Sequence, residues 1–245
     1  ITLNDPENRN SLTDEVKNGL GGGLERAAAD DAVQMIVIRN TGHVFCAGAN
    51  LKASTRPAET TYGLVRILQL IQDSPKPVIA AISGHCMGGG VGLAAACDIS
   101  IAAEDVKFGF TEVRLGVTPA IISVVCLPKM RKSDAMELFL TGRRIPAARA
   151  AEVGLITASV PVEEFDAACD AMIGDIGRGG PIAIGICKEL VQRVPQMPRD
   201  EAFDWANTLS RGLFGSAEAA EGIAAFRERR DPAWVTDRGR ATGRE

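Results

Sequence analysis

The sequence has few of the residues on which metal sites and serine hydrolases depend. It contains two histidines, His43 and His85, in 245 residues, so a histidine-based metal site is not expected and a Ser-His-Asp triad has almost no choice of base. Its six cysteines include no C-x-x-C pair, which favours buried, reduced thiols over zinc binding or disulfides. We therefore expect no metal and a cytoplasmic location.

Long apolar runs and an excess of positive charge are also missing. No apolar stretch approaches the roughly 18 residues of a membrane span, and we expect no signal peptide, although a first residue other than methionine leaves open a short missing leader. The net charge of −4 gives no broad cationic surface for nucleic acid. With 46% hydrophobic residues, the composition predicts a globular protein with a sizeable core that binds neither membrane nor nucleic acid.

The first half of the chain alternates strand-like and helix-like segments. Short runs rich in valine and isoleucine, bounded by polar residues or glycine, are typical of buried parallel strands. Amphipathic or alanine-rich segments between them predict helices. The expected strands are residues 33–39, 78–83 and 98–102, and the expected helices are residues 13–29, 61–72 and 90–96. This order predicts a right-handed parallel α/β core.

The second half of the chain is predicted to be almost entirely helical. After about residue 119 the strand signal nearly disappears, and helices are expected over residues 133–140, 147–153, 163–176, 182–194, 201–213 and 217–229. So many helices must cap the sheet, pair with other subunits, or do both. Ala135, Leu138 and Phe139 are expected to form an exposed apolar stripe that another subunit covers.

The segment GHCMGGGVGLAAACD, residues 84–98, has five glycines within nine residues. Several glycines together indicate that something approaches the main chain closely. A phosphate-binding P-loop is excluded because no lysine or hydroxyl residue follows the glycines. A dinucleotide fingerprint fits poorly in its distance from the preceding strand, and no G-x-S-x-G elbow is present. The remaining candidate is an oxyanion hole, formed by main-chain N–H groups at a helix start.

An oxyanion hole usually needs a second donor, and the small-residue loop FCAGANL, residues 45–51, is the expected source. Each of the two loops follows a predicted parallel strand. Either loop alone could be a tight turn needed only for packing. Their joint presence favours a functional site.

The ordered set of motifs resembles the enoyl-CoA hydratase/isomerase, or crotonase, superfamily. The matching pieces are PENRNSL at residues 6–12, FCAGANL, KPVIAAISGHCMGGGVGLAAACD at 76–98, FGFTEVRLGVTP at 108–119, LTGRRI at 140–145, AAEVGLI at 150–156 and EGIAAFRERRDPAW near the end. They follow the family order over nearly the whole chain. The set is specific, although no single motif decides the assignment.

The resemblance implies a ClpP/crotonase-like α/β spiral of ββα units over residues 1–190 and a C-terminal helical trimerisation region over residues 191–245. It also implies an acyl-CoA thioester substrate, no separate cofactor because CoA is part of the substrate, and a homotrimer or dimer of trimers. By position, the main-chain N–H groups of Ala49 and Gly89 would be the oxyanion donors. Ala47 and Lys52 would contact CoA, and the other substrate-binding candidates are Asn50, Leu51, Gly88 and Gly92. Asn50 stands where aspartate is common in the family.

Glu112 aligns with one of the two glutamates of typical hydratases and is the candidate acid/base, whereas the second glutamate falls at Gly92. A hydratase holds its water between two carboxylates, but an isomerase can shuttle a proton with one. Three hypotheses remain open: a single-glutamate enoyl-CoA hydratase, a Δ3,Δ2-enoyl-CoA isomerase, and a noncatalytic acyl-CoA-binding protein. Asp98 is interpreted as a structural residue where a helix meets a strand.

Overall fold

The computed structural model describes residues 1–50 and 61–235. The chain divides into two compact units. The first unit contains Ile1–Ser74 and Val78–Ala168, and the second unit contains Pro75–Pro77 and the chain from Cys169 onward. The domain boundary expected at residue 190 stays a prediction.

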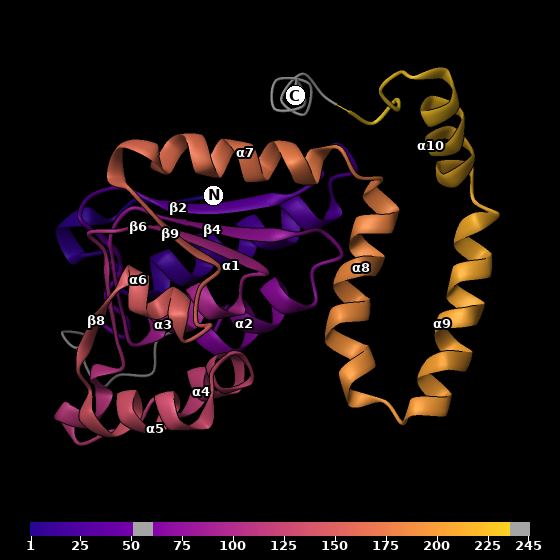
Figure 1. Ribbon diagram of the computed structural model, residues 1–245. Coiled ribbons are helices and arrows are strands. Elements are labelled where there is room, and N and C mark those ends of the chain that lie inside the picture. The colour runs from indigo at the N-terminus through magenta and orange to yellow at the C-terminus, as the bar shows by residue number, and fades with distance from the viewer. Residues whose placement is uncertain (51–60, 236–245) are drawn as a thin grey trace. The chain divides into compact units, whose positions relative to one another are not determined.

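The first unit is built around a five-stranded parallel sheet with the order β1-β2-β4-β6-β9. Its central strands are the runs of valine, isoleucine and alanine that the sequence predicted, and every residue of β4 is buried. Figure 1 shows β2, β4 and β6 running side by side. The strands are β1 (Thr2–Leu3), β2 (Ile36–Asn40), β4 (Val78–Ile82), β6 (Ile99–Ala103) and β9 (Ala158–Val160).

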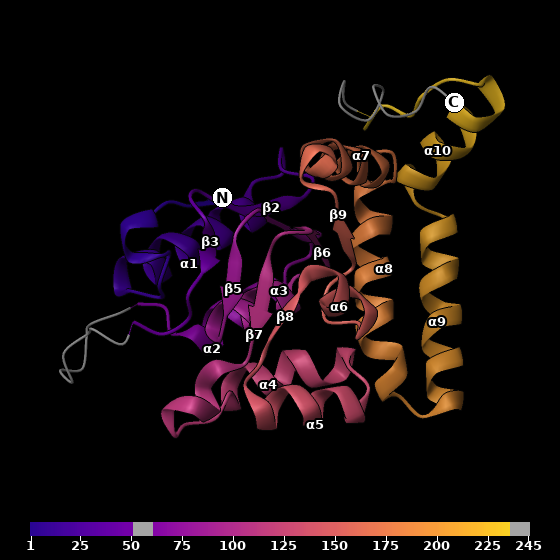
Figure 2. The same ribbon diagram turned by 60° about the vertical axis from the view of Figure 1, so that its left-hand side comes forward.

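A second sheet of short strands has the order β3-β5-β7-β8, with only β7 and β8 antiparallel (Figure 2). Each central strand of the first sheet is followed by one of these short strands, and in the first two repeats the next described element is a helix. This is the predicted spiral of ββα units, and the α/β fold class is confirmed. The strands are β3 (Val44–Cys46), β5 (His85–Met87), β7 (Lys107–Gly109) and β8 (Arg144–Pro146).

The helices of the first unit pack their apolar faces on these sheets and on one another. Thr13 begins α1 by accepting a hydrogen bond from the Val16 N–H through its hydroxyl, and all residues of α3 are buried. The helices are α1 (Asp14–Ala29), α2 (Leu64–Gln72), α3 (Gly89–Ala96), α4 (Ala120–Cys126), α5 (Lys132–Thr141), α6 (Ala147–Glu152) and the start of α7 (Phe165–Gly177). Short 3-10 helices occur at Pro6–Asn8, Thr111–Leu115, Leu127–Lys129 and Val162–Glu164.

The prediction of an exposed apolar stripe on α5, formed by Ala135, Leu138 and Phe139, is wrong. Ala135 and Leu138 are only 6% and 2% exposed, and the Phe139 ring packs on the Phe110 ring with centroids 4.4 Å apart. The exposed apolar side chains of α5 are instead Met136 and Leu140, at 54% and 70%. The spacing identified an apolar face, but that face packs within the first unit.

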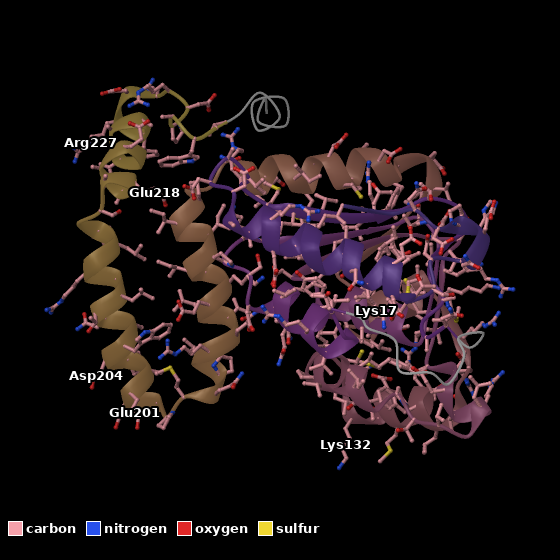
Figure 3. All side chains as sticks on the ribbon, turned by 180° about the vertical axis from the view of Figure 1, so that it is seen from behind. Lys17, Lys132, Glu201, Asp204, Glu218 and Arg227 are labelled. Atoms are coloured by element: carbon pink, nitrogen blue, oxygen red, sulfur yellow. The ribbon has the colours of Figure 1, made fainter. Side chains whose placement is uncertain are left out.

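The second unit is helical, as predicted. It contains the end of α7, then α8 (Pro181–Arg193), the 3-10 helix Val194–Gln196, α9 (Arg199–Phe214) and α10 (Ala217–Glu228). The Glu218 carboxylate accepts hydrogen bonds of 2.9 Å from the N–H groups of Ile182 and Ala183 and so caps α8 from α10; Figure 3 labels Glu218. Within residues 1–50 and 61–235, no helix combines the length and the apolar composition needed to cross a bilayer.

Candidate active site

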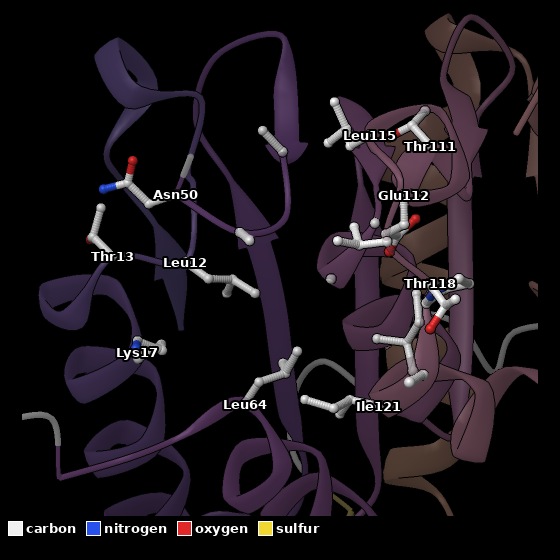
Figure 4. Close-up of a pocket in the computed structure, with 18 of the residues that line it drawn as sticks. Leu12, Thr13, Lys17, Asn50, Leu64, Thr111, Glu112, Leu115, Thr118 and Ile121 are labelled. Atoms are coloured by element: carbon white, nitrogen blue, oxygen red, sulfur yellow. The ribbon is translucent and has the colours of Figure 1, made fainter. Parts of the chain in front are cut away.

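The first unit contains a pocket of about 960 Å³ between the start of α1, the glycine-rich turn into α3, and the segment that leads into α4 (Figure 4). Six of the predicted site residues line it, namely Ala47, Ala49, Asn50, Gly88, Gly89 and Glu112. Gly92 is buried in α3, outside this lining set. Leu51 and Lys52 lie outside the described residues.

The two predicted loops meet at Gly48. This glycine has a φ of +84°, and a Cβ added to it would lie 2.8 Å from the Met87 carbonyl oxygen and 3.0 Å from the Gly89 nitrogen. The Leu12 N–H donates a 2.8 Å hydrogen bond to the Gly48 carbonyl, and Leu12 forms an isolated parallel bridge with Ala49. The loop after β3 is therefore fixed directly against the start of α3, at a distance that only glycine permits.

The main-chain amides of Ala49 and Gly89 are available at this junction. Gly88, with a φ of +52°, turns the chain so that Gly89 becomes the first residue of α3. Neither amide donates a hydrogen bond to another residue in the described part of the chain. Main-chain N–H groups without partners at a helix N-terminus attract negative charge.

Glu112 stands beside this turn, on the 3-10 helix Thr111–Leu115. A Cβ added to Gly88 would lie 3.0 Å from Glu112 Oε1, so the carboxylate lies against the glycine main chain. Its Oε2 atom is buried and has no hydrogen-bond partner among the described residues. Burial raises the pKa of Glu112, because a charged carboxylate is poorly solvated there.

This geometry can be compared with known proteins. The family model described as enoyl-CoA hydratase/isomerase matches residues 1–237 of the chain. The chain belongs to the enoyl-CoA hydratase/isomerase family. It is therefore an enzyme of the hydratase or isomerase type.

Several members of this family are similar to the chain in sequence, and solved structures of such proteins are similar to it in fold. The enoyl-CoA hydratase EchA19 of Mycobacterium tuberculosis is 33% identical over 241 residues, covering 95% of this chain and 91% of that protein. The (E)-benzylidenesuccinyl-CoA hydratase of Thauera aromatica is 32% identical over 242 residues, covering 96% and 94%. A crystal structure of enoyl-CoA hydratase from Bacillus anthracis is 31% identical with a TM-score of 0.88, covering 96% and 93%.

The charged residues among the described residues that line this pocket are Asp14, Lys17 and Glu112. The Lys17 ammonium pairs with the Asp14 carboxylate at 2.7 Å on α1. Figure 4 shows Lys17 and Thr13 across the pocket from Glu112. Glu112 is thus a carboxylate whose charge no ion pair in the described residues compensates.

Sequence reasoning missed most of the apolar wall of the pocket. Leu64 of α2 and the stretch before and within α4 line it, including Leu115, Val117, Ile121 and Ile122. The helix α4 itself was not predicted. The apolar segment AIIS directly after Pro119 was the available signal, because proline favours a helix start.

Two residues near the site have structural roles. The Asp98 carboxylate accepts a 2.7 Å hydrogen bond from the Val78 N–H, which agrees with its structural interpretation. His85 Nδ1 accepts a 3.2 Å hydrogen bond from the Lys107 N–H and so joins β5 to β7. Five of the six cysteines are buried and Cys187 is exposed, all as free thiols.

Proposed function

We propose that the protein acts on an acyl-CoA thioester as an enoyl-CoA hydratase-type enzyme. One observation carries this proposal: the amides of Ala49 and Gly89, which have no acceptor among the described residues, line one pocket with Glu112, whose Oε2 atom has no partner there. The family assignment supports the class of substrate. Ala47, Asn50 and Gly88 complete the proposed binding segment on the same loops. Leu51, Lys52 and Gly92, which are not among the described lining residues, stay predictions. No separate cofactor is needed, since CoA is part of the substrate.

In the proposed mechanism the thioester oxygen accepts hydrogen bonds from the Ala49 and Gly89 amides. These donors stabilise the enolate more than the ground-state carbonyl, because negative charge develops on that oxygen during the reaction. In hydration, the oxygen of a water molecule bonds to the β-carbon while Glu112 takes one proton from it. The same proton is then delivered to the α-carbon, and the oxyanion returns to a carbonyl.

A Δ3,Δ2-enoyl-CoA isomerase is the second candidate, and a specific observation favours it. Glu112 is the carboxylate of the described pocket lining that is not ion-paired, whereas Asp14 is paired with Lys17, which Figure 4 shows across the pocket from Glu112. One carboxylate is enough to take a proton from the α-carbon and return it to the γ-carbon.

An absorbance screen of the purified protein tests both candidates. Crotonyl-CoA and 3-methylglutaconyl-CoA report hydration as the conjugated double bond is lost, and a 3-enoyl-CoA reports isomerisation as conjugation is gained. Turnover of only one class identifies the reaction. Binding of acyl-CoA without turnover of any of the three would instead support the noncatalytic hypothesis.

We also propose a homotrimer or dimer of trimers in the cytoplasm. Exposed apolar side chains such as Val124 at 70% and Leu140 support assembly, because such surface favours burial between subunits. The buried free thiols support a reducing compartment. Light scattering at micromolar concentration should give three or six times the mass of one chain, and a monomer would contradict the assembly.

A further inference from the structure

Gly92 in α3 and Ile122 in α4 pack directly against each other. A Cβ added to Gly92 would collide with Ile122 Cγ2 and lie 2.8 Å from Ile122 Cβ, whereas Ile122 Cα would remain at an ordinary 3.7 Å. Ile122 is only 2% exposed, yet it contributes to the pocket wall. The space into which a side chain at position 92 would extend is therefore filled by the Ile122 side chain.

The wall on which Ile122 lies offers little to hold a water molecule beside Glu112. Its other described residues near the start of α4 are mainly apolar, and its polar side chains are the hydroxyls of Thr111 and Thr118. Neither hydroxyl titrates near neutral pH. A bound water usually needs two to four polar partners, and the Ile122 side chain supplies none.

We propose that Ile122 is a specificity-determining residue. By filling the space over Gly92, its side chain keeps a second acid–base group and an oriented water molecule away from Glu112. It thereby favours proton transfer between carbons over the addition of water. The inference rests on the second candidate of the proposed function, the isomerase reaction at the same pocket. In the favoured reaction the Cα–H bond breaks as Glu112 takes the proton, and a Cγ–H bond forms as Glu112 returns it. No water is consumed, so the closed wall does not slow this reaction.

The experiment measures kcat/KM for hydration of a 2-enoyl-CoA and for isomerisation of the 3-enoyl-CoA of the same chain length. The variants are Ile122→Gly, which removes every side-chain atom over Gly92, and Gly92→Glu combined with Ile122→Gly. Ile121→Gly is the matched control, because it makes the same deletion in the same pocket-lining helix but not over Gly92. Ile122→Ala carries the same test if Ile122→Gly does not fold.

We expect Ile122→Gly to raise the ratio of hydration to isomerisation by about 10-fold. The double variant should raise it by about 10-fold again, because a positioned acid–base group contributes about 10² or more to a rate. Ile121→Gly should leave the ratio within about threefold of wild type. Gly92→Glu alone should lower the melting temperature without raising the ratio, since its side chain meets Ile122.

An unchanged ratio in folded Ile122 variants would overturn the role of Ile122 while leaving the proposed function intact. The same conclusion would follow if Ile121→Gly changed the ratio as much as Ile122→Gly. A wild-type protein that catalyses neither reaction would refute the proposed function itself. Glu112→Gln in the wild-type background should lower both rates by about 10²-fold or more, which ties the measured turnover to this pocket.

Discussion

Replacing Glu112 by glutamine should lower activity while leaving stability unchanged or raising it. The carboxylate is half-buried and Oε2 has no partner among the described residues. Burial raises its pKa above the usual 4.5, so the folded protein binds this proton more tightly than the unfolded chain does. The stability that results is present below pH 4.5 and is lost as pH rises through the folded-state pKa.

At neutral pH the charged carboxylate is therefore a cost to the folded state, and glutamine removes the charge while keeping the shape. An unsatisfied buried polar group costs about 1–3 kcal/mol. The gain should be at most about 1 kcal/mol, because the side chain is half-exposed to screening water and the amide also lacks partners. For a chain of this size that corresponds to about 2–4 °C in melting temperature.

The activity of the same variant should fall by about 10²-fold or more, since the proton carrier is lost. In the wild type, kcat/KM should rise with pH through a pKa above 4.5, as the base form of Glu112 accumulates. Calorimetric titration with a nonreacting acyl-CoA should show that binding persists. Full turnover by Glu112→Gln on every substrate of the wild type would refute the mechanism, and a lower melting temperature at neutral pH would refute the burial argument.

Two further substitutions test how the site is held. Asn10 is fully buried, and its side chain accepts a hydrogen bond from one main-chain N–H and donates to two carbonyls. Asn10→Ala should therefore lower the free energy of unfolding in urea by about 3 kcal/mol. The control Asn8→Ala, at an exposed position, should lower it by under about 0.5 kcal/mol, and equal losses would contradict the role of Asn10. Gly48→Ala should cut kcat/KM by about 10²-fold as the two loops separate. The control Gly116→Ala also places a side chain at a positive φ, here +74°, but this side chain meets nothing within 4 Å. It should therefore lower stability and cost far less activity, and similar activity losses would remove the role of the contact with Gly89.

The central strands and most helices could be predicted from the sequence, but the second sheet could not. β2, β4 and β6 are each five residues long and mainly apolar, which is long enough to show a buried-strand pattern. The strands β3, β5 and β7 have three residues each, and no periodicity can be recognised over so short a length. The resemblance to the family supplied the ββα arrangement that local patterns lacked.

The candidate site could be predicted where it depends on the main chain and not where it depends on packing. The glycine-rich turn indicated main-chain donors at a helix start, because a run of glycines can be recognised in a sequence. The resemblance to the family assigned the donor to Gly89. Glu112 was identified by resemblance alone, and its missing partner is a property of the folded pocket. The contact between Gly92 and Ile122 joins positions thirty residues apart, so no local pattern could reveal it.

The residues of the proposed site are also the ones whose local structure is energetically unfavourable in the first unit. Gly48 and Gly88 have the positive φ angles that bring two loops together. Among the described residues, the Ala49 and Gly89 amides lack acceptors and Glu112 Oε2 lacks a donor. Each feature costs free energy in the empty protein, because polar groups without partners are unfavourable once water is excluded. On the proposed function, a bound thioester would satisfy the amides with its oxygen and present Glu112 with an acidic C–H. A nonreacting acyl-CoA at 100 times its Kd should then stabilise the protein by about 2.7 kcal/mol, and Glu112→Gln should retain this stabilisation whereas Gly48→Ala should lose most of it.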